Sequence, residues 1–156
     1  LPSVGVFLGG DQLQHFGAVR QAFVTTDAGR QFGPVLGHPP HPDERIDFGL
    51  ISPYKAQVQY LRSKIRGNSF LRPFRSLITV NTVDGFQGQE RDVIFISLVR
   101  ANEDGQIGFL NDLRRMNVAI TRARMKLVIL GDATTLAQHP FYRKLMQYIR
   151  QSGTPV

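Results

Sequence analysis

The 156-residue sequence contains no cysteine and no tryptophan. Without cysteine the chain has neither disulfide bonds nor cysteine-ligated metal sites. Long apolar runs are also missing, since the longest, at 93–99 and 127–131, are far shorter than a membrane span requires. The N-terminus has no basic region before an apolar patch, so no secretory signal is predicted. We therefore expect no membrane partner and an intracellular, cytoplasmic setting.

Histidine and lysine are scarce, with four residues of each. The histidines have no spacing typical of metal ligands, so no metal site is predicted. Fifteen arginines dominate the basic residues, and the charge is uneven: residues 1–54 carry a net −2 and residues 55–156 a net +9. A basic surface favours a polyanion such as nucleic acid, and planar guanidinium groups suit phosphate. On charge alone, a merely solvated basic face is the alternative.

The first 45 residues differ from the rest of the chain. They are rich in glycine and end in the breaker-rich stretch GHPPHPDER at 37–45. They show no sustained periodicity, although AVRQAFVTT at 18–26 could form one short element. We interpret residues 1–45 as an irregular segment and residues 46–156 as the one domain that the length allows.

From Ile46 onward, strand-like and helix-like patterns alternate. Apolar stretches predict four strands, at 48–52, 76–80, 92–99 and 126–132. Helical spacing predicts three helices, at 54–67, 112–123 and 140–151. The last helix is expected to bury Phe141, Leu145, Tyr148 and Ile149 as core rather than to stack bases. Such alternation predicts an α/β fold, a parallel sheet with helices on both faces.

Ligands of such a sheet bind beyond the carboxyl ends of its strands. We expect three polar segments to meet there: SPYKAQ at 52–57, NTVDGFQGQERD at 81–92 and TRAR at 121–124. The last segment holds two arginines between apolar runs, Arg122 and Arg124. A buried arginine requires an anionic partner, because an unpaired charge is costly to remove from water.

The same segments resemble motifs of a known family. ISPYKAQ (51–57), TVDGFQGQERDVIFISLVRAN (82–102) and GFLNDLRRMNVAITRAR (108–124) resemble motifs IV, V and VI of superfamily 1 helicases, in particular the up-frameshift and RecD-like groups. The resemblance covers residues 46–152, about two thirds of the chain. It implies the second of two RecA-like domains, a P-loop NTPase-type fold that meets its partner domain across a cleft holding ATP and magnesium.

The resemblance implies a nucleotide-binding set of residues. Arg122 matches the arginine finger that contacts the γ-phosphate, and is therefore the catalytic candidate. Gln87, Gly88 and Glu90 match the nucleotide side of motif V. Arg124 is a further candidate for phosphate, with a structural salt bridge as the alternative.

The resemblance also implies a nucleic-acid-binding set. These residues match positions of motifs IV and V along the path of a single strand: Ser52, Pro53, Tyr54, Thr82 and Val83. Tyr54 could instead be a core residue, as the first member of the helical stripe at 54–67. Arg115 and Asn117 are expected to brace motif VI against motif V.

The sequence contains no GxxxxGK[ST] loop, which cradles phosphates in this fold class. The acids at 43–44 follow a proline-rich linker rather than a strand, so they are not a credible magnesium-binding pair. The resemblance therefore implies that the chain is the C-terminal motor domain of an ATP-dependent DNA or RNA helicase. Its partners would be single-stranded nucleic acid and the N-terminal RecA-like domain of the same protein. Alone it should not hydrolyse ATP. The alternative is a stand-alone, non-catalytic nucleic-acid-binding module.

Overall fold

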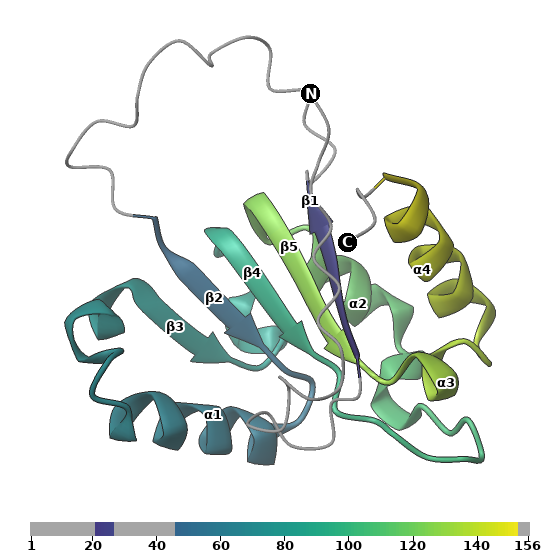
Figure 1. Cartoon of the computed structure of the whole chain (residues 1–156), viewed down its shortest axis with the longest axis horizontal. Helices are drawn as coiled ribbons and strands as arrows, with labels where there is room; N and C mark the ends of the chain where they lie inside the picture. Colours follow the sequence, from purple (N-terminus) through teal and green to yellow (C-terminus); the bar gives the residue numbers. More distant parts are fainter. Residues whose placement is uncertain (1–20, 27–45, 153–156) are drawn as a thin grey trace, which may run out of the picture.

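The computed structural model of the protein describes residues 21–26 and 46–152 (Figure 1). Its strands form one sheet in the order β1-β5-β4-β2-β3. The strands are β1 (Gln21–Thr26), β2 (Phe48–Ile51), β3 (Ile78–Asn81), β4 (Arg91–Ser97) and β5 (Ala123–Gly131). Strands β2 to β5 are parallel, as predicted, and β1 pairs antiparallel with β5.

Helices cover both faces of this sheet, which confirms the predicted α/β class. The α-helices are α1 (Lys55–Gly67), α2 (Leu113–Ile120), α3 (Ala133–Leu136) and α4 (Pro140–Ser152). Three short 3₁₀ helices lie between them, η3 (Arg72–Leu77), η4 (Asp84–Phe86) and η5 (Gly108–Asn111). Helix α1 packs near β3, whereas α2 and α4 lie beyond β5 in Figure 1.

The main core lies between the central strands and the helices α2 and α4. Alternate residues of a strand point to the same face, and those that face this core are Ile94, Ile96, Leu127 and Ile129. Met116 and Ala119 of α2 pack against them, with Tyr142, Met146 and Ile149 of α4. A smaller core on the other face joins Val58 and Leu61 of α1 to Val80 of β3. Each fully buried aliphatic side chain contributes about 1.5–3 kcal/mol.

The prediction for the last helix is wrong in one residue. Tyr148 is 59% exposed, whereas Tyr142 is 1% exposed and fills the core. The buried face of α4 runs through Tyr142, Met146 and Ile149, a spacing of four and three residues. The Tyr142 hydroxyl donates a hydrogen bond to the Leu110 carbonyl at 2.7 Å, which satisfies its polar group. Burial, and to a lesser extent the charge of Tyr54, raises the pKa of Tyr142.

The segment interpreted from the sequence as irregular contributes one strand, inside the stretch 18–26 that was allowed as one short element. β1 pairs with β5 along its whole length, from Gln21 opposite Gly131 to Thr26 opposite Lys126. Backbone pairing with a free strand edge requires no particular side-chain period, so the pattern of 18–26 did not define this strand. The linker predicted at 37–45 lies outside the described residues.

Strand β5 begins three residues earlier than predicted, at Ala123. Arg124 lies before the continuous apolar run, so the apolar pattern alone placed the start at 126. Strand β3 begins later than predicted, because Ser76 and Leu77 belong to η3. In the described ranges, no helix is long and apolar enough to cross a membrane.

Candidate nucleotide and nucleic-acid interfaces

The five predicted nucleic-acid-binding residues meet at the carboxyl edge of β2 and β3. The Ser52 N–H donates to the Asn81 carbonyl at 3.2 Å, which ties the ends of these parallel strands together. Ser52 is fully buried and Val83 nearly so. Their side chains therefore support the edge, whereas the Thr82 side chain is only half-buried. The Thr82 hydroxyl also accepts a hydrogen bond from the Gly85 N–H at 3.3 Å.

Tyr54 lies at this edge rather than in the core of α1. It is the N-cap residue of α1, and its ring meets the Phe109 ring edge-on with centroids 5.8 Å apart. The Arg100 guanidinium lies 5.6 Å from the Tyr54 centroid, and its Nε donates to the Tyr54 hydroxyl at 2.9 Å. Arg100 and the exposed Phe109 are thus additional side chains at this site. Both residues lie inside segments that resemble the helicase motifs, and this resemblance is the sequence signal that could have identified them.

A strained turn positions Arg100. Val99, which follows β4, has φ of 67°, and in the described ranges no other non-glycine residue has a positive φ. The Arg100 N–H donates to the Leu98 carbonyl at 2.8 Å, which closes a three-residue γ-turn around Val99. A β-branched residue in this region is a true outlier that costs about 1–3 kcal/mol. The turn directs the chain, and with it Arg100, towards Tyr54.

The two arginines of the TRAR segment lie at the opposite edge, which corrects the expectation that all three polar segments meet at the carboxyl ends. Arg122 precedes β5 and Arg124 is its second residue, so both lie at its amino end. Strand β4 runs parallel to β5, with Arg91 opposite Ala123. The Arg91 N–H donates to the Arg122 carbonyl at 3.0 Å. Residues that lead into a strand lie at its start, and the starts of parallel neighbours share one edge.

Carboxylates balance Arg124 but not Arg122. The Arg124 Nη2 atom lies 3.0 Å from Asp92 Oδ1 and 3.3 Å from Asp47 Oδ1. This pairing is the structural salt bridge that was the alternative to a phosphate-binding role for Arg124. The Arg122 Nε atom donates to the Val118 carbonyl at 3.0 Å and its Nη2 to the Thr121 hydroxyl at 3.2 Å. Across the described part of the chain, Arg122 forms no ion pair.

Motif V connects the two edges. From β3 it turns through η4, passes the core and enters β4 at Arg91. Phe86 and Ile94 pack closely against Gly49 of β2, where an added Cβ would lie 2.5 Å from Ile94 Cδ1 and 2.9 Å from Phe86 Cε1, so a side chain there would force a neighbour to shift. Gln87, Gly88 and Glu90 are exposed, and Gly88 adopts φ of 74°, a left-handed conformation that glycine accepts without cost. Glu90 therefore lies beside the amino edge that carries Arg122.

Motif VI is braced against motif V, as expected for Arg115. The Arg115 Nη2 atom lies 3.4 Å from Asp84 Oδ2 of η4, and its Nε atom lies 3.6 Å from Asp112 Oδ2. These side chains are well exposed, so the contact orients the segments more than it stabilises them. For Asn117 the structure gives no side-chain partner within its described residues.

Comparison with known proteins agrees with this architecture. A family model described as AAA domain matches residues 36–134. The chain is 45% identical to the probable helicase MAGATAMA 3 of Arabidopsis thaliana, over 65% of this chain and 12% of that protein. It is 44% identical to Helicase SEN1 of Saccharomyces cerevisiae, over 67% of this chain and 5% of that protein. It is 40% identical to the DNA replication ATP-dependent helicase/nuclease DNA2 of Bos taurus, over 66% of this chain and 9% of that protein.

The fold and the matched motifs together define the class of the chain: an α/β RecA-like domain of the helicases. The chain belongs to the AAA domain family, as a C-terminal superfamily 1 helicase domain of the up-frameshift-like group. It spans between 5% and 12% of the length of the three relatives just described.

Proposed function

We propose that this chain is the C-terminal motor domain of an ATP-dependent DNA or RNA helicase. In this proposal it closes over ATP and magnesium that are held mainly by an N-terminal RecA-like domain of the same protein. The observation that carries the proposal is the contrast between neighbouring arginines: Arg124 is paired with two carboxylates, whereas Arg122 forms no ion pair with a described residue. An unpaired guanidinium that is already oriented suits an anion arriving from outside the domain.

The amino edge provides half of a nucleotide site. Arg122 would supply positive charge to the γ-phosphate, where phosphoryl transfer spreads negative charge over the equatorial oxygens. Glu90 would accept hydrogen bonds from the ribose hydroxyls, and the side-chain amide of Gln87 would line the same side. The sequence offers no glycine-rich phosphate loop to complete the site. The isolated chain is therefore proposed not to hydrolyse ATP.

The carboxyl edge provides the contact with single-stranded nucleic acid. The Thr82 hydroxyl is half-buried at this edge, and the Val83 N–H has no hydrogen-bond partner among the described residues. Both groups suit phosphate and sugar oxygens. Pro53 and Tyr54 would line the same path, with Tyr54 held by Arg100. Contacts of this kind bind the backbone, so binding should depend weakly on sequence and strongly on salt.

The short connection between the two edges offers a route for coupling. Residues 82–90 run from the proposed strand path to the proposed nucleotide side, and Phe86 anchors their middle in the core. A displacement of Glu90 on cleft closure would therefore be transmitted to Thr82 through one packed segment. Cycles of closure and opening would then move the bound strand.

The direct test is Arg122→Ala in the full-length protein that carries the phosphate-binding domain. An arginine finger contributes about 10³–10⁵-fold to the rate, so strand-stimulated ATP hydrolysis should fall by at least about 10³-fold. Arg114→Ala is the matched control, because Arg114 is an exposed arginine of α2 in the same motif. ATP hydrolysis near the wild-type rate in Arg122→Ala would disprove the assignment of the finger.

The second candidate function is a stand-alone module that binds nucleic acid without hydrolysis. It is favoured by one observation, the absence of a phosphate loop from a chain that is strongly basic after residue 54. The two functions differ in their response to nucleotide. For a motor, the affinity of the full-length protein for single strands should change when a non-hydrolysable ATP analogue binds, whereas for a module it should stay constant.

A further inference from the structure

Helix α1 carries a polar stripe beside its apolar face. Val58, Leu61 and Ile65 face the smaller core. The polar stripe lies one position further along the chain than these apolar residues. It consists of Lys55, Gln59, Arg62 and Arg66, at spacings of four, three and four residues. Residues at this spacing lie on one side of a helix. The sequence from 48 to 83 contains no acidic residue, so the stripe has no complementary charge nearby in the sequence.

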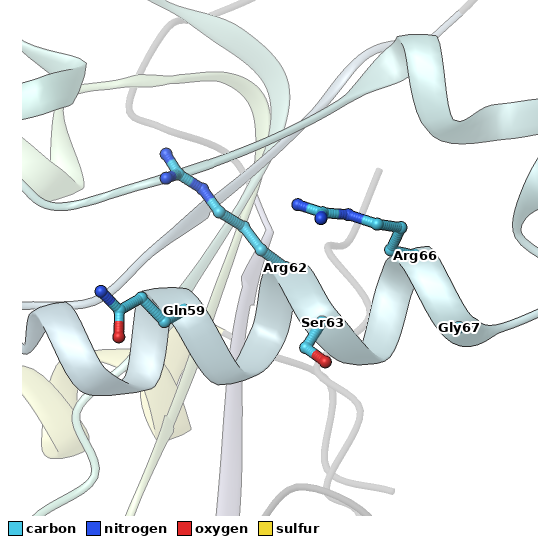
Figure 2. A pocket seen from close by; sticks show the side chains of 5 residues that line it. All are labelled: Gln59, Arg62, Ser63, Arg66 and Gly67. Carbon is cyan, nitrogen blue, oxygen red and sulfur yellow. The ribbon is translucent and has the colours of Figure 1, made fainter.

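The stripe lies towards the free edge of the sheet. Strand β3 is the last in the sheet order, and the Arg62 guanidinium donates to its Val80 carbonyl from Nε at 3.0 Å and from Nη2 at 2.7 Å. Figure 2 shows that Arg62 and Arg66 project to the same side of the helix. Together with Gln59, Ser63 and Gly67 they line an open hollow of about 560 Å³ (Figure 2).

Two guanidinium groups at this spacing repel each other unless an anion lies between them. Neither Arg62 nor Arg66 forms an ion pair with any residue that the structure describes. A third guanidinium is close: Arg75 donates to the carbonyls of Arg66 and Asn68, while its Nε atom is buried without a partner. This surface therefore concentrates positive charge that the described residues leave unbalanced.

Two exposed aromatic rings follow α1 in the chain, one just before η3 and one within it. Phe70 is 77% exposed and Phe74 is 44% exposed, and their centroids are 6.3 Å apart. Guanidinium groups together with exposed rings suit single-stranded nucleic acid, since phosphates pair with the former and bases stack on the latter. An acidic polypeptide would use the charge but would leave the rings without a flat partner.

The stripe begins where the proposed strand path ends. Lys55 directly follows Tyr54, so the stripe starts at the carboxyl edge of β2. Eleven residues separate Lys55 from Arg66, which corresponds to about 16 Å along the helix axis. We propose that this stripe extends the path of a bound single strand along α1, with Arg62 and Arg66 contacting backbone phosphates beyond motifs IV and V. The inference rests on the proposed function, because its path continues from motif IV.

The test compares single-stranded oligothymidylates of two lengths, about 6 and about 20 nucleotides, since strand-binding sites span about 4–16 nucleotides. Fluorescence anisotropy with the 156-residue chain gives the affinity of each over a series of salt concentrations. Arg62→Gln/Arg66→Gln should weaken binding of the longer strand about tenfold and of the shorter one less than about twofold. The slope of log affinity against log salt should fall by about 1.4 for the longer strand, which is about 0.7 for each lost phosphate contact.

The matched control is Lys64→Gln/Lys144→Gln, which removes the same charge elsewhere. Lys64 lies on another side of α1, over the Tyr60 ring, and Lys144 is exposed on α4. This variant should bind both strands almost as the wild type does. Arg66→Gln alone is a second variant, because Arg62 also holds the Val80 carbonyl. It should weaken binding of the longer strand about threefold without changing the thermal unfolding midpoint.

Each result bears on one of the two proposals. If the wild type binds both strands and the arginine variants bind the longer one unchanged, the stripe is not part of the path while the track of motifs IV and V stands. If the wild type binds neither strand, the stripe and the track of motifs IV and V both fail in this chain, while the Arg122→Ala test of ATP hydrolysis separately decides the motor function. The arginine variants are also titrated with a poly-glutamate of matched charge. If their binding to it weakens by the same factor as their binding to the longer strand, the stripe belongs to acidic polypeptides and the inference is overturned.

Discussion

Arg124 and Asp92 form an ion pair at the amino edge of the sheet, with Nη2 3.0 Å from Oδ1. Asp47, which precedes β2, shares this guanidinium at 3.3 Å, so three parallel strands are tied together where they begin. Two residues earlier, the Arg122 side chain has only the Val118 carbonyl and the Thr121 hydroxyl as partners among the described residues. The two arginines of one motif therefore differ in their surroundings: Arg124 balances charge within the domain, whereas Arg122 is the one that the proposed function assigns to an external anion.

Arg124→Gln should cost stability and leave chemistry largely intact. The Arg124 side chain is 45% exposed, and pairs this exposed contribute at most about 1 kcal/mol after solvent screening. We expect the free energy of unfolding in urea to fall by about 1 kcal/mol, because Asp47 and Asp92 lose their shared cation. ATP hydrolysis by the full-length protein should fall less than about tenfold. A loss as large as that expected for Arg122→Ala would instead place Arg124 on the nucleotide.

The sequence predicted the parallel strands and the motif positions because both depend on local patterns. The apolar runs of β4 and β5 mark buried strands, and the motif VI match makes Arg122 the candidate finger, a prediction that needs no knowledge of its neighbours. The partners of Arg124 were not predictable, since Asp47 lies 77 residues away and only the strand order brings them together. The amino edge that carries TRAR was predictable, by contrast, because a segment that leads into a parallel strand lies at the start of that strand.

Local patterns also cannot reveal backbone strain or the exact buried face of a helix. Val99 follows an apolar run and has no sequence feature typical of a turn, yet it adopts a positive φ. In α4, the helical spacing of the apolar residues is compatible with either Tyr142 or Tyr148 on the buried face. The contact of Tyr142 with Leu110, 32 residues earlier, determines which of the two is buried.

Thr82→Val should weaken strand binding without unfolding the domain. The substitution keeps the branched shape and removes the hydroxyl, which is worth about 0.5–1.5 kcal/mol as a hydrogen bond. The affinity for a single-stranded oligonucleotide should therefore fall about three- to tenfold in an anisotropy titration. Thr134→Val is the control, since Thr134 is exposed on α3, which follows β5, and β4 and β2 separate β5 from β3 in the sheet. Unchanged affinity in Thr82→Val would remove its hydroxyl from the proposed track.

Val99→Gly should be far less damaging than the same substitution within β4. Glycine adopts φ of 67° freely, so relief of about 1–2 kcal/mol of strain offsets the loss of a half-buried side chain. Val93 is also half-buried but lies within the paired part of β4. Urea unfolding should show that Val93→Gly costs at least about 1.5 kcal/mol more than Val99→Gly. Equal costs would mean that the turn at Val99 stores no strain.

Tyr142→Phe should reduce stability and also change its dependence on pH. Losing the hydroxyl leaves the buried Leu110 carbonyl without its donor, at a cost of about 1–2 kcal/mol. The pKa of Tyr142 is raised above its ordinary value of 10.0, so the folded state holds the hydroxyl proton more tightly than the unfolded state does. This contribution is complete below pH 10 and is lost as pH rises above it.

Urea unfolding of the wild type and Tyr142→Phe, measured at pH 8 and at successive values above pH 10, separates these two effects. The gap in unfolding free energy between them should be largest at pH 8 and should narrow as alkali removes the proton in the unfolded state first. Tyr148→Phe is the control, because Tyr148 is exposed on the same helix and should match the wild type at every pH. A gap that stayed constant above pH 10 would show that the Tyr142 hydroxyl titrates alike in both states, and the buried hydrogen bond would then have to be reassigned.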